Sequence, residues 1–82
     1  MSANDRIRLF IVRELHWTGA PDELTDDYPL IERNVLDSVG IFHLTSFLER
    51  EFEMVVDDEE LVPENYGSIG RLTSFVESKR TN

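Results

Sequence analysis

The sequence predicts an all-α domain with three main helices, one short helix and a long first loop. Apolar residues recur at helical spacing in three segments, whereas the alternation typical of a half-buried strand is almost missing. The chain has 82 residues, which suits one domain, residues 1–82. It contains no cysteine, so no disulfide staples the core and no thiol can act as a nucleophile or zinc ligand.

The first helix is expected from about Asn4 to His16. Asn4 can cap its N-terminus, and Asp5 suits the positive end of the helix dipole. Gly19 and Pro21 end the segment. One face of this helix carries the apolar side chains of Ile7, Phe10, Ile11 and Leu15, which we expect to be buried.

A long connection follows, from Thr18 to Asp37. It begins with TGAPDELTDDYPL, which is rich in Gly, Pro, Asp and Thr, and Pro29 biases the residue before it away from helix. Structureless loops of this length are uncommon inside compact domains. We expect this loop to lie against the core because it contains Leu24, Tyr28, Leu30, Ile31 and Leu36. Trp17, just before the loop, is expected to be a partly buried anchor.

The second helix is expected from Ser38 to Glu51. Its apolar stripe, which would pack against the first helix, consists of Ile41, Leu44, Leu48 and Phe52, widened by Phe47. Val39 and Phe42 fall largely off this stripe, so these apolar side chains are expected to face water at the start of the helix. Gly40 in the first turn is a poor helix former and costs about 1 kcal/mol relative to alanine.

The last third of the chain predicts one short helical turn and a final helix. Residues 54–56 look like an extended run that enters the core, and residues 57–60 look like a solvated acidic run that lacks the ligand spacing of a calcium loop. A short turn is expected at Pro63–Tyr66, with Tyr66 packed inward, and Ser68 can cap a helix from Ile69 to Lys79. Its apolar face consists of Ile69, Leu72, Phe75 and Val76.

The charge is strongly acidic, with 17 acidic against 8 basic residues and a net charge of −9. Such a surface repels phosphate backbones, so we expect no nucleic-acid partner. It attracts basic patches on partner proteins. The N-terminal MSANDRIRLF lacks the apolar region of a signal peptide, and nothing approaches the length of a membrane span. We therefore expect a cytoplasmic monomer with no membrane partner.

The stretch NVLDSVGIFHL places a polar pair, Asp37 and Ser38, directly before an apolar helix. In one interpretation the pair only starts the helix, with Ser38 as its cap. In the other, Ser38 is an exposed handle that a second enzyme modifies, because a phosphate group there would lie at the positive helix end. Ser38 is not a hydrolase nucleophile: the GxSxG turn is missing, and His43 lies more than one helical turn along the same helix. No nucleophile–base pair or metal cluster predicts an enzyme.

The segment LDSVGIFHLTSFLEREF resembles the phosphopantetheine attachment region of acyl carrier proteins, whose motif is Asp-Ser-Leu at the start of the second of four helices. The resemblance covers almost the whole chain and implies an acyl-carrier-protein-like bundle of four helices. The Leu-Asp-Ser form, together with FLEREF and PENYGSI, looks more like a stand-alone carrier of a specialised biosynthetic pathway than the housekeeping fatty-acid carrier.

The resemblance implies that a phosphopantetheinyl transferase attaches 4'-phosphopantetheine from coenzyme A to Ser38, and that Asp37 helps to bind the metal-bearing coenzyme A complex. The arm would hold acyl or aminoacyl groups as thioesters. A ligase or acyltransferase would load them, and downstream synthase enzymes of polyketide, nonribosomal peptide or fatty-acid-type biosynthesis would receive them. The residues that would contact partners are Val39, Phe42, Ser46, Glu49 and Glu53.

The chain departs from the family pattern before the serine. Many members have glycine three residues before it, where this chain has Val35, and another subset has glycine four residues before it, where this chain has Asn34. Asparagine tolerates a left-handed backbone, so the turn can survive. The alternative function is a helical interaction module without a covalent group, in which Val39 and Phe42 bind protein and Ser38 is only a helix cap.

Overall fold

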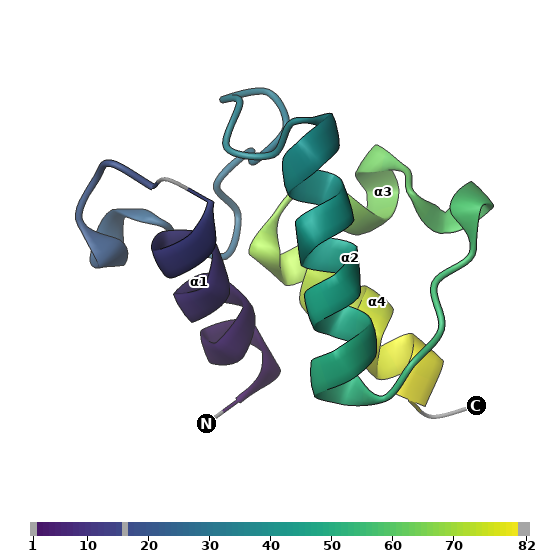
Figure 1. Cartoon of the computed structure of the whole chain (residues 1–82). Helices are drawn as coiled ribbons and strands as arrows, with labels where there is room; N and C mark the ends of the chain where they lie inside the picture. Colours follow the sequence, from purple (N-terminus) through teal and green to yellow (C-terminus); the bar gives the residue numbers. More distant parts are fainter. Residues whose placement is uncertain (1, 16, 81–82) are drawn as a thin grey trace.

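The structure is a computed structural model that describes residues 2–15 and 17–80. The described part of the chain contains helices and no strand, which confirms the predicted all-α fold. The elements are α1 (Ala3–Glu14), the 3-10 helix η1 (Pro21–Glu23), α2 (Ser38–Phe52), the 3-10 helix η2 (Asp58–Glu60), α3 (Pro63–Tyr66) and α4 (Ile69–Arg80). Figure 1 shows α2 in the middle, with α1 and α3 on either side and α4 behind it.

The core forms where the apolar faces of the helices meet. Because α4 packs against α1, α2 and α3, it is the element that holds the bundle together. The apolar stripes predicted for the three main helices point inward, although Phe10, Ile41 and Phe47 remain half-buried. The fully or almost fully buried side chains include Ile7, Ile11, Leu24, Leu30, Leu36, Leu44, Leu48, Tyr66, Ile69, Leu72 and Val76.

The start of α1 differs from the prediction. Ser2, not Asn4, is the N-cap residue, with an extended backbone and a hydroxyl that donates to the Asp5 carboxylate at 2.9 Å. Asn4 lies inside the helix, and its side-chain amide donates to the Asp26 carboxylate at 3.2 Å. Both residue types are good caps, so the sequence alone does not distinguish them. The helix ends at Glu14, and the predicted end at His16 lies outside the described residues.

Helix α2 touches α1 through aromatic side chains, but the predicted packing of its whole apolar stripe against α1 is wrong, because α1 packs mainly against α4. The rings of Phe10 and Phe47 are stacked with their centroids 4.4 Å apart. An ion pair between the Arg6 guanidinium and the Glu51 carboxylate, with 3.2 Å between nitrogen and oxygen, crosses the same pair of helices. Such exposed pairs contribute little to stability.

The first loop lies against the core, as expected, but it is not structureless. Pro21 starts η1, and the Glu23 carboxylate accepts a hydrogen bond from the Ala20 N–H at 2.7 Å. Trp17 is half-buried, with its ring edge against Tyr28 and its indole N–H donating to the Ala20 carbonyl at 2.9 Å. This confirms Trp17 as an anchor that holds the loop to the end of α1.

Two predictions for the segment after α2 are wrong. Met54 is buried, but Val55 is 70% exposed, because neighbouring side chains of an extended run point to opposite sides. The acidic run is not solvated throughout, since Glu60 is half-buried and its carboxylate binds the Lys79 ammonium at 2.9 Å. This ion pair joins η2 to the last turn of α4.

The short helix and the last helix are placed as predicted. Tyr66 is 1% exposed, and its hydroxyl forms a hydrogen bond with the Thr45 hydroxyl of α2 at 2.7 Å. This burial raises the pKa of Tyr66 above its ordinary value. Ser68 caps α4, because its hydroxyl accepts from the Arg71 N–H at 3.2 Å.

Candidate functional site

The structure at the start of α2 shows which of the two polar residues, Asp37 or Ser38, caps the helix. Asp37 is the N-cap: its backbone is extended, and its Oδ1 accepts from the Gly40 N–H at 2.7 Å. Ser38 is therefore the first helical residue. Its side chain is exposed and makes no hydrogen bond with the residues that the structure describes. The interpretation of Ser38 as the cap is wrong, because the carboxylate of Asp37 already satisfies the first turn.

A tight turn presents Asp37 at this position. Asn34 has a φ of 59°, in the left-handed region, so the predicted tolerance of asparagine is used here. The N–H groups of Val35 and Leu36 both donate to the Leu30 carbonyl, at 2.9 and 3.1 Å. Because Leu30 and Leu36 are buried, the turn is fixed to the core at both ends.

The capping carboxylate of Asp37 explains the glycine at position 40. Gly40 is buried in the first turn of α2. A Cβ atom at this position would lie 3.2 Å from Asp37 Oδ1 and 3.6 Å from Leu36 Cδ2. Glycine therefore leaves room for the capping carboxylate, at the cost in helix propensity that the sequence indicates.

The predicted partner residues divide into two groups along α2. Val39 and Phe42 are 62% and 67% exposed, as predicted, and both lie within the first turns after Ser38. Ser46 is also exposed. These three exposed side chains run from the start of α2 to its middle.

The two glutamates lie at the far end of α2. Glu49 is half-buried, and its carboxylate accepts from the Val56 N–H at 2.9 Å, so it holds the segment that follows the helix. Glu53 is exposed and ends the helix in the left-handed conformation, with a φ of 52°. Helical periodicity in the sequence does not predict this hydrogen bond, because Glu49 lies in α2 and the Val56 N–H lies in the segment after it.

A hollow of about 580 Å³ lies beside the cap, and the sequence did not indicate it. Val39 and His43 line it from α2, Asp37 lines it from the N-cap of that helix, and Trp17 and Tyr28 line it from the end of α1 and the first loop. These residues come from separate segments, so no local pattern could reveal the hollow. His43 is exposed, as a surface residue would be. The described residues contain no cluster of three or more His, Cys, Asp or Glu side chains that could hold a metal ion.

Comparison with known proteins decides the family. The chain matches none of the family models with which it was compared. It is similar to the probable acyl carrier protein PigG of Serratia sp. (strain ATCC 39006), with 32% identity over 59 residues, which cover 72% of this chain and 68% of that protein. The chain belongs to the acyl carrier protein family. The predicted resemblance to acyl carrier proteins is thereby confirmed, and a carrier role rather than a catalytic one follows.

This acyl carrier protein presents its Asp-Ser pair where the family motif lies, at the start of the second α-helix. Val39 replaces the leucine of that motif and remains exposed. None of the helices in the described residues has the length and apolar character needed to cross a membrane.

Proposed function

We propose that this carrier holds its cargo on a 4'-phosphopantetheine arm joined to the hydroxyl of Ser38. The observation that supports this proposal is the division of roles at the start of α2. Asp37 caps the helix, which leaves the Ser38 hydroxyl exposed and without a hydrogen-bond partner among the described residues. This arrangement leaves the Ser38 hydroxyl accessible to a modifying enzyme.

The residues around Ser38 suit a phosphate ester. The first turn of a helix of 15 residues offers the positive end of the helix dipole to a negative group. The second carboxylate oxygen of Asp37, Oδ2, makes no hydrogen bond with the described residues, so it is available to the metal-bearing coenzyme A complex during transfer. The serine oxygen would form a phosphodiester and displace the nucleotide part of coenzyme A, with the transferase supplying the base.

The arm's terminal thiol would hold an acyl or aminoacyl group as a thioester, loaded by a ligase or an acyltransferase. The chain itself supplies presentation and recognition. Val39 and Phe42 offer apolar contacts close to Ser38, and Ser46 extends this surface along α2. We propose that downstream enzymes of polyketide, nonribosomal peptide or fatty-acid-type biosynthesis dock here, and that the net charge of −9 attracts their basic residues.

The mass of the intact protein tests this proposal. After incubation with coenzyme A, magnesium and a broad-specificity phosphopantetheinyl transferase, the mass should rise by one phosphopantetheine group. Ser38→Ala should show no increase and yet remain folded. Ser74→Ala is the matched control, because Ser74 is exposed on α4 and should leave modification complete.

Two outcomes would contradict the proposal. One is an unmodified wild-type chain in a reaction in which a known carrier is modified. The other is a mass increase that persists in Ser38→Ala, since the arm would then be attached elsewhere.

A further inference from the structure

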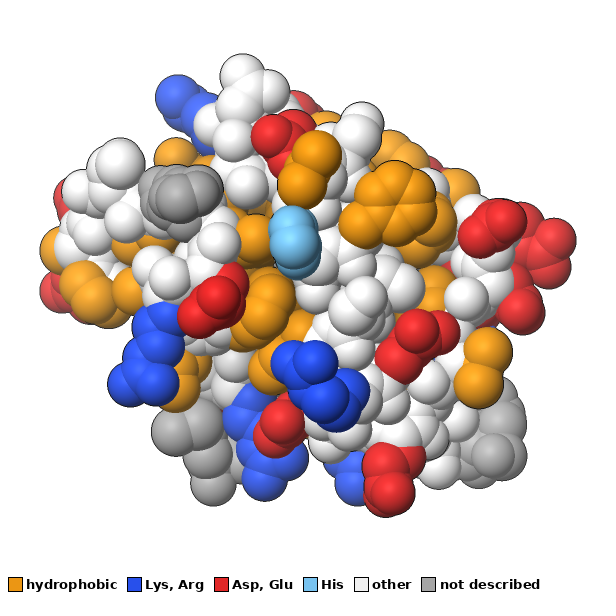
Figure 2. Space-filling view, viewed as in Figure 1, with side chains coloured by type: hydrophobic (Ala, Val, Ile, Leu, Met, Phe, Trp, Pro, Cys, Tyr) orange, Lys and Arg blue, Asp and Glu red, His pale blue; other side chains and the backbone are white. Residues whose placement is uncertain are grey.

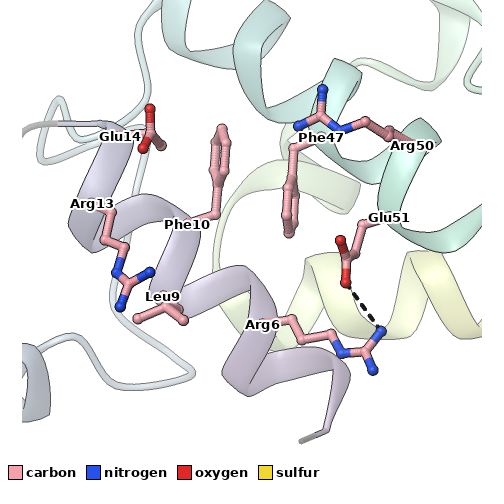
Figure 3. A pocket seen from close by; sticks show the side chains of 8 residues that line it. All are labelled: Arg6, Leu9, Phe10, Arg13, Glu14, Phe47, Arg50 and Glu51. Carbon is pink, nitrogen blue, oxygen red and sulfur yellow. Dashed lines mark hydrogen bonds and ion pairs between the residues drawn. The ribbon is translucent and has the colours of Figure 1, made fainter.

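A groove of about 670 Å³ lies between α1 and the second half of α2. Its floor is aromatic and aliphatic: the stacked rings of Phe10 and Phe47 are half-buried, and Leu9 is 37% exposed. Figure 3 shows these side chains between the two helices. The floor therefore offers apolar surface to a partner without any rearrangement of the core.

The rim of this groove is basic, which is unusual in a chain with only 8 basic residues and a net charge of −9. Arg6 is paired with Glu51 at 3.2 Å. The guanidinium groups of Arg13 and Arg50, on opposite helices in Figure 3, make no ion pair or hydrogen bond with any described residue. Glu14 also lines the groove, so two unpaired guanidinium groups face one unpaired carboxylate.

We propose that this groove docks a partner-protein segment in which carboxylates flank an aliphatic side chain. The carboxylates would bind Arg13 and Arg50, because a guanidinium matches the planar geometry of a carboxylate. The aliphatic side chain would lie over Phe10 and Phe47. Figure 2 shows basic, hydrophobic and acidic side chains together over the space between α1 and α2, and a further group of acidic ones over the segment that follows α2.

Charge complementarity identifies the kind of partner. Outside the groove, the acidic surface of this chain attracts basic patches of a partner. Inside the groove, the guanidinium groups of Arg13 and Arg50 can bind the partner's acidic side chains. A partner that carries both kinds of patch is therefore held in one orientation. A nucleic acid does not fit, because the net charge of −9 repels it.

The groove is separate from the surface around Ser38. Phe47 follows Ser38 by nine residues in α2, which corresponds to roughly 13 Å along the helix axis. A segment bound in the groove would leave Ser38, Val39 and Phe42 accessible. It would keep the partner close while those residues engage an active site, which raises the effective concentration of the second contact. This inference does not depend on the arm.

A second copy of the chain is a weaker occupant. Exposed Val55 lies between the acidic residues Glu53 and Asp57, so this segment has the required chemistry. Two chains that each carry a charge of −9 nevertheless repel one another. Self-association is therefore an outcome that the experiment must distinguish.

The test is a nuclear magnetic resonance titration of the unmodified, isotope-labelled chain of 82 residues with two synthetic helical peptides. Both carry leucines along one face, flanked by glutamates in the first peptide and by glutamines in the second. The glutamate peptide should cause saturable shifts confined to the groove and bind about fivefold more tightly, as two modest ion pairs would give. Added salt should reduce this difference.

Variants assign the effect to the groove. The double substitution Arg13→Gln with Arg50→Gln should remove the preference for the glutamate peptide. Arg33→Gln is the matched control, because Arg33 is exposed, lies outside the groove and makes no ion pair with the described residues. The double variant should keep a dispersed spectrum, which shows that it remains folded.

Several results would overturn the proposal. They are the absence of saturable shifts, equal affinity for the two peptides, shifts centred on Val39 and Phe42, and an unchanged preference in the double variant. Shifts of the groove residues that depend on protein concentration without peptide would assign the groove to a second copy instead.

Discussion

Asp37 and Ser38 are adjacent in the chain, but their side chains have different surroundings. The Asp37 carboxylate is tied to the Gly40 N–H, whereas the Ser38 hydroxyl is exposed and unbonded within the described residues. Replacing Asp37 should therefore lower the stability of the fold, whereas replacing Ser38 should prevent modification and leave the stability unchanged.

Asp37→Ala should lower the free energy of unfolding by about 1 kcal/mol, because the first turn of α2 loses its cap. Ser38→Ala should change it by less than about 0.5 kcal/mol, the range of surface substitutions that break no contact. Urea denaturation measures both values. Asp37→Asn is the control, since asparagine caps about as well as aspartate. An equal loss in Ser38→Ala would return the capping role to the serine.

At the scale of elements, the two 3-10 helices and the short α3 connect the longer helices, and η2 is attached to α4 by an ion pair. The hydrogen bond from the Asp57 N–H lowers the pKa of Glu60, and Lys79 adds to this effect. The hydrogen bond with Glu60 raises the pKa of Lys79. Both shifts favour the charged pair in the folded state.

The sign of the pH dependence follows from these shifts. A lowered pKa in the folded state means that Glu60 stabilises the protein above its ordinary pKa of 4.5 and loses this contribution as the pH falls through the folded value. The raised pKa of Lys79 means that its contribution is fully present below its ordinary value of 10.5 and is lost as the pH rises through the folded value. The ion pair therefore stabilises the fold fully at pH values between the ordinary pKa of Glu60, 4.5, and that of Lys79, 10.5.

Glu60→Gln should lower the melting temperature at neutral pH, and the difference from the wild type should shrink as the pH falls below about 4.5. Thermal unfolding at a series of pH values measures this. Glu59→Gln is the matched neighbour, because Glu59 is exposed and unbonded among the described residues and should show no such loss. A difference that does not vary with pH would show that the loss at position 60 is not electrostatic.

For the whole molecule, charge and core size are the dominant features. The core is small for a domain that carries a net charge of −9. Repulsion among the carboxylates therefore lowers a free energy of unfolding that is already small. The few ion pairs of the described residues compensate only a fraction of this charge.

Salt or divalent cations should therefore raise the melting temperature, because they screen or bind the excess carboxylates. For a domain of this size, each 1 kcal/mol gained corresponds to about 4–8 °C. Calorimetry at low and high salt measures the effect. The double variant Asp58→Asn with Glu59→Gln removes two exposed negative charges and should show a smaller increase. A melting curve that responds to neither salt nor divalent cations would contradict this account.

Much of the fold could be predicted because its signals are local. Helical spacing identified the buried faces of α1, α2 and α4, and the same spacing showed that Val39 and Phe42 point outward. The left-handed turn at Asn34 and the cap at Ser68 follow from the chemistry of single residues. The motif, read with this helix pattern, also predicted the family to which the chain belongs.

The sequence by itself determined the helices, their apolar faces and the Asp-Ser pair at the start of α2, because each depends on residues within a few positions of one another. Only the tertiary structure decided that Asp37 rather than Ser38 is the cap, since both residue types can cap and the backbone geometry chooses between them. Only the tertiary structure shows the ion pair between Glu60 and Lys79. The same holds for the groove in which Phe10 and Phe47 lie beside the arginines of α1 and α2. These contacts join residues far apart in the chain, and no local periodicity encodes a distance across the bundle.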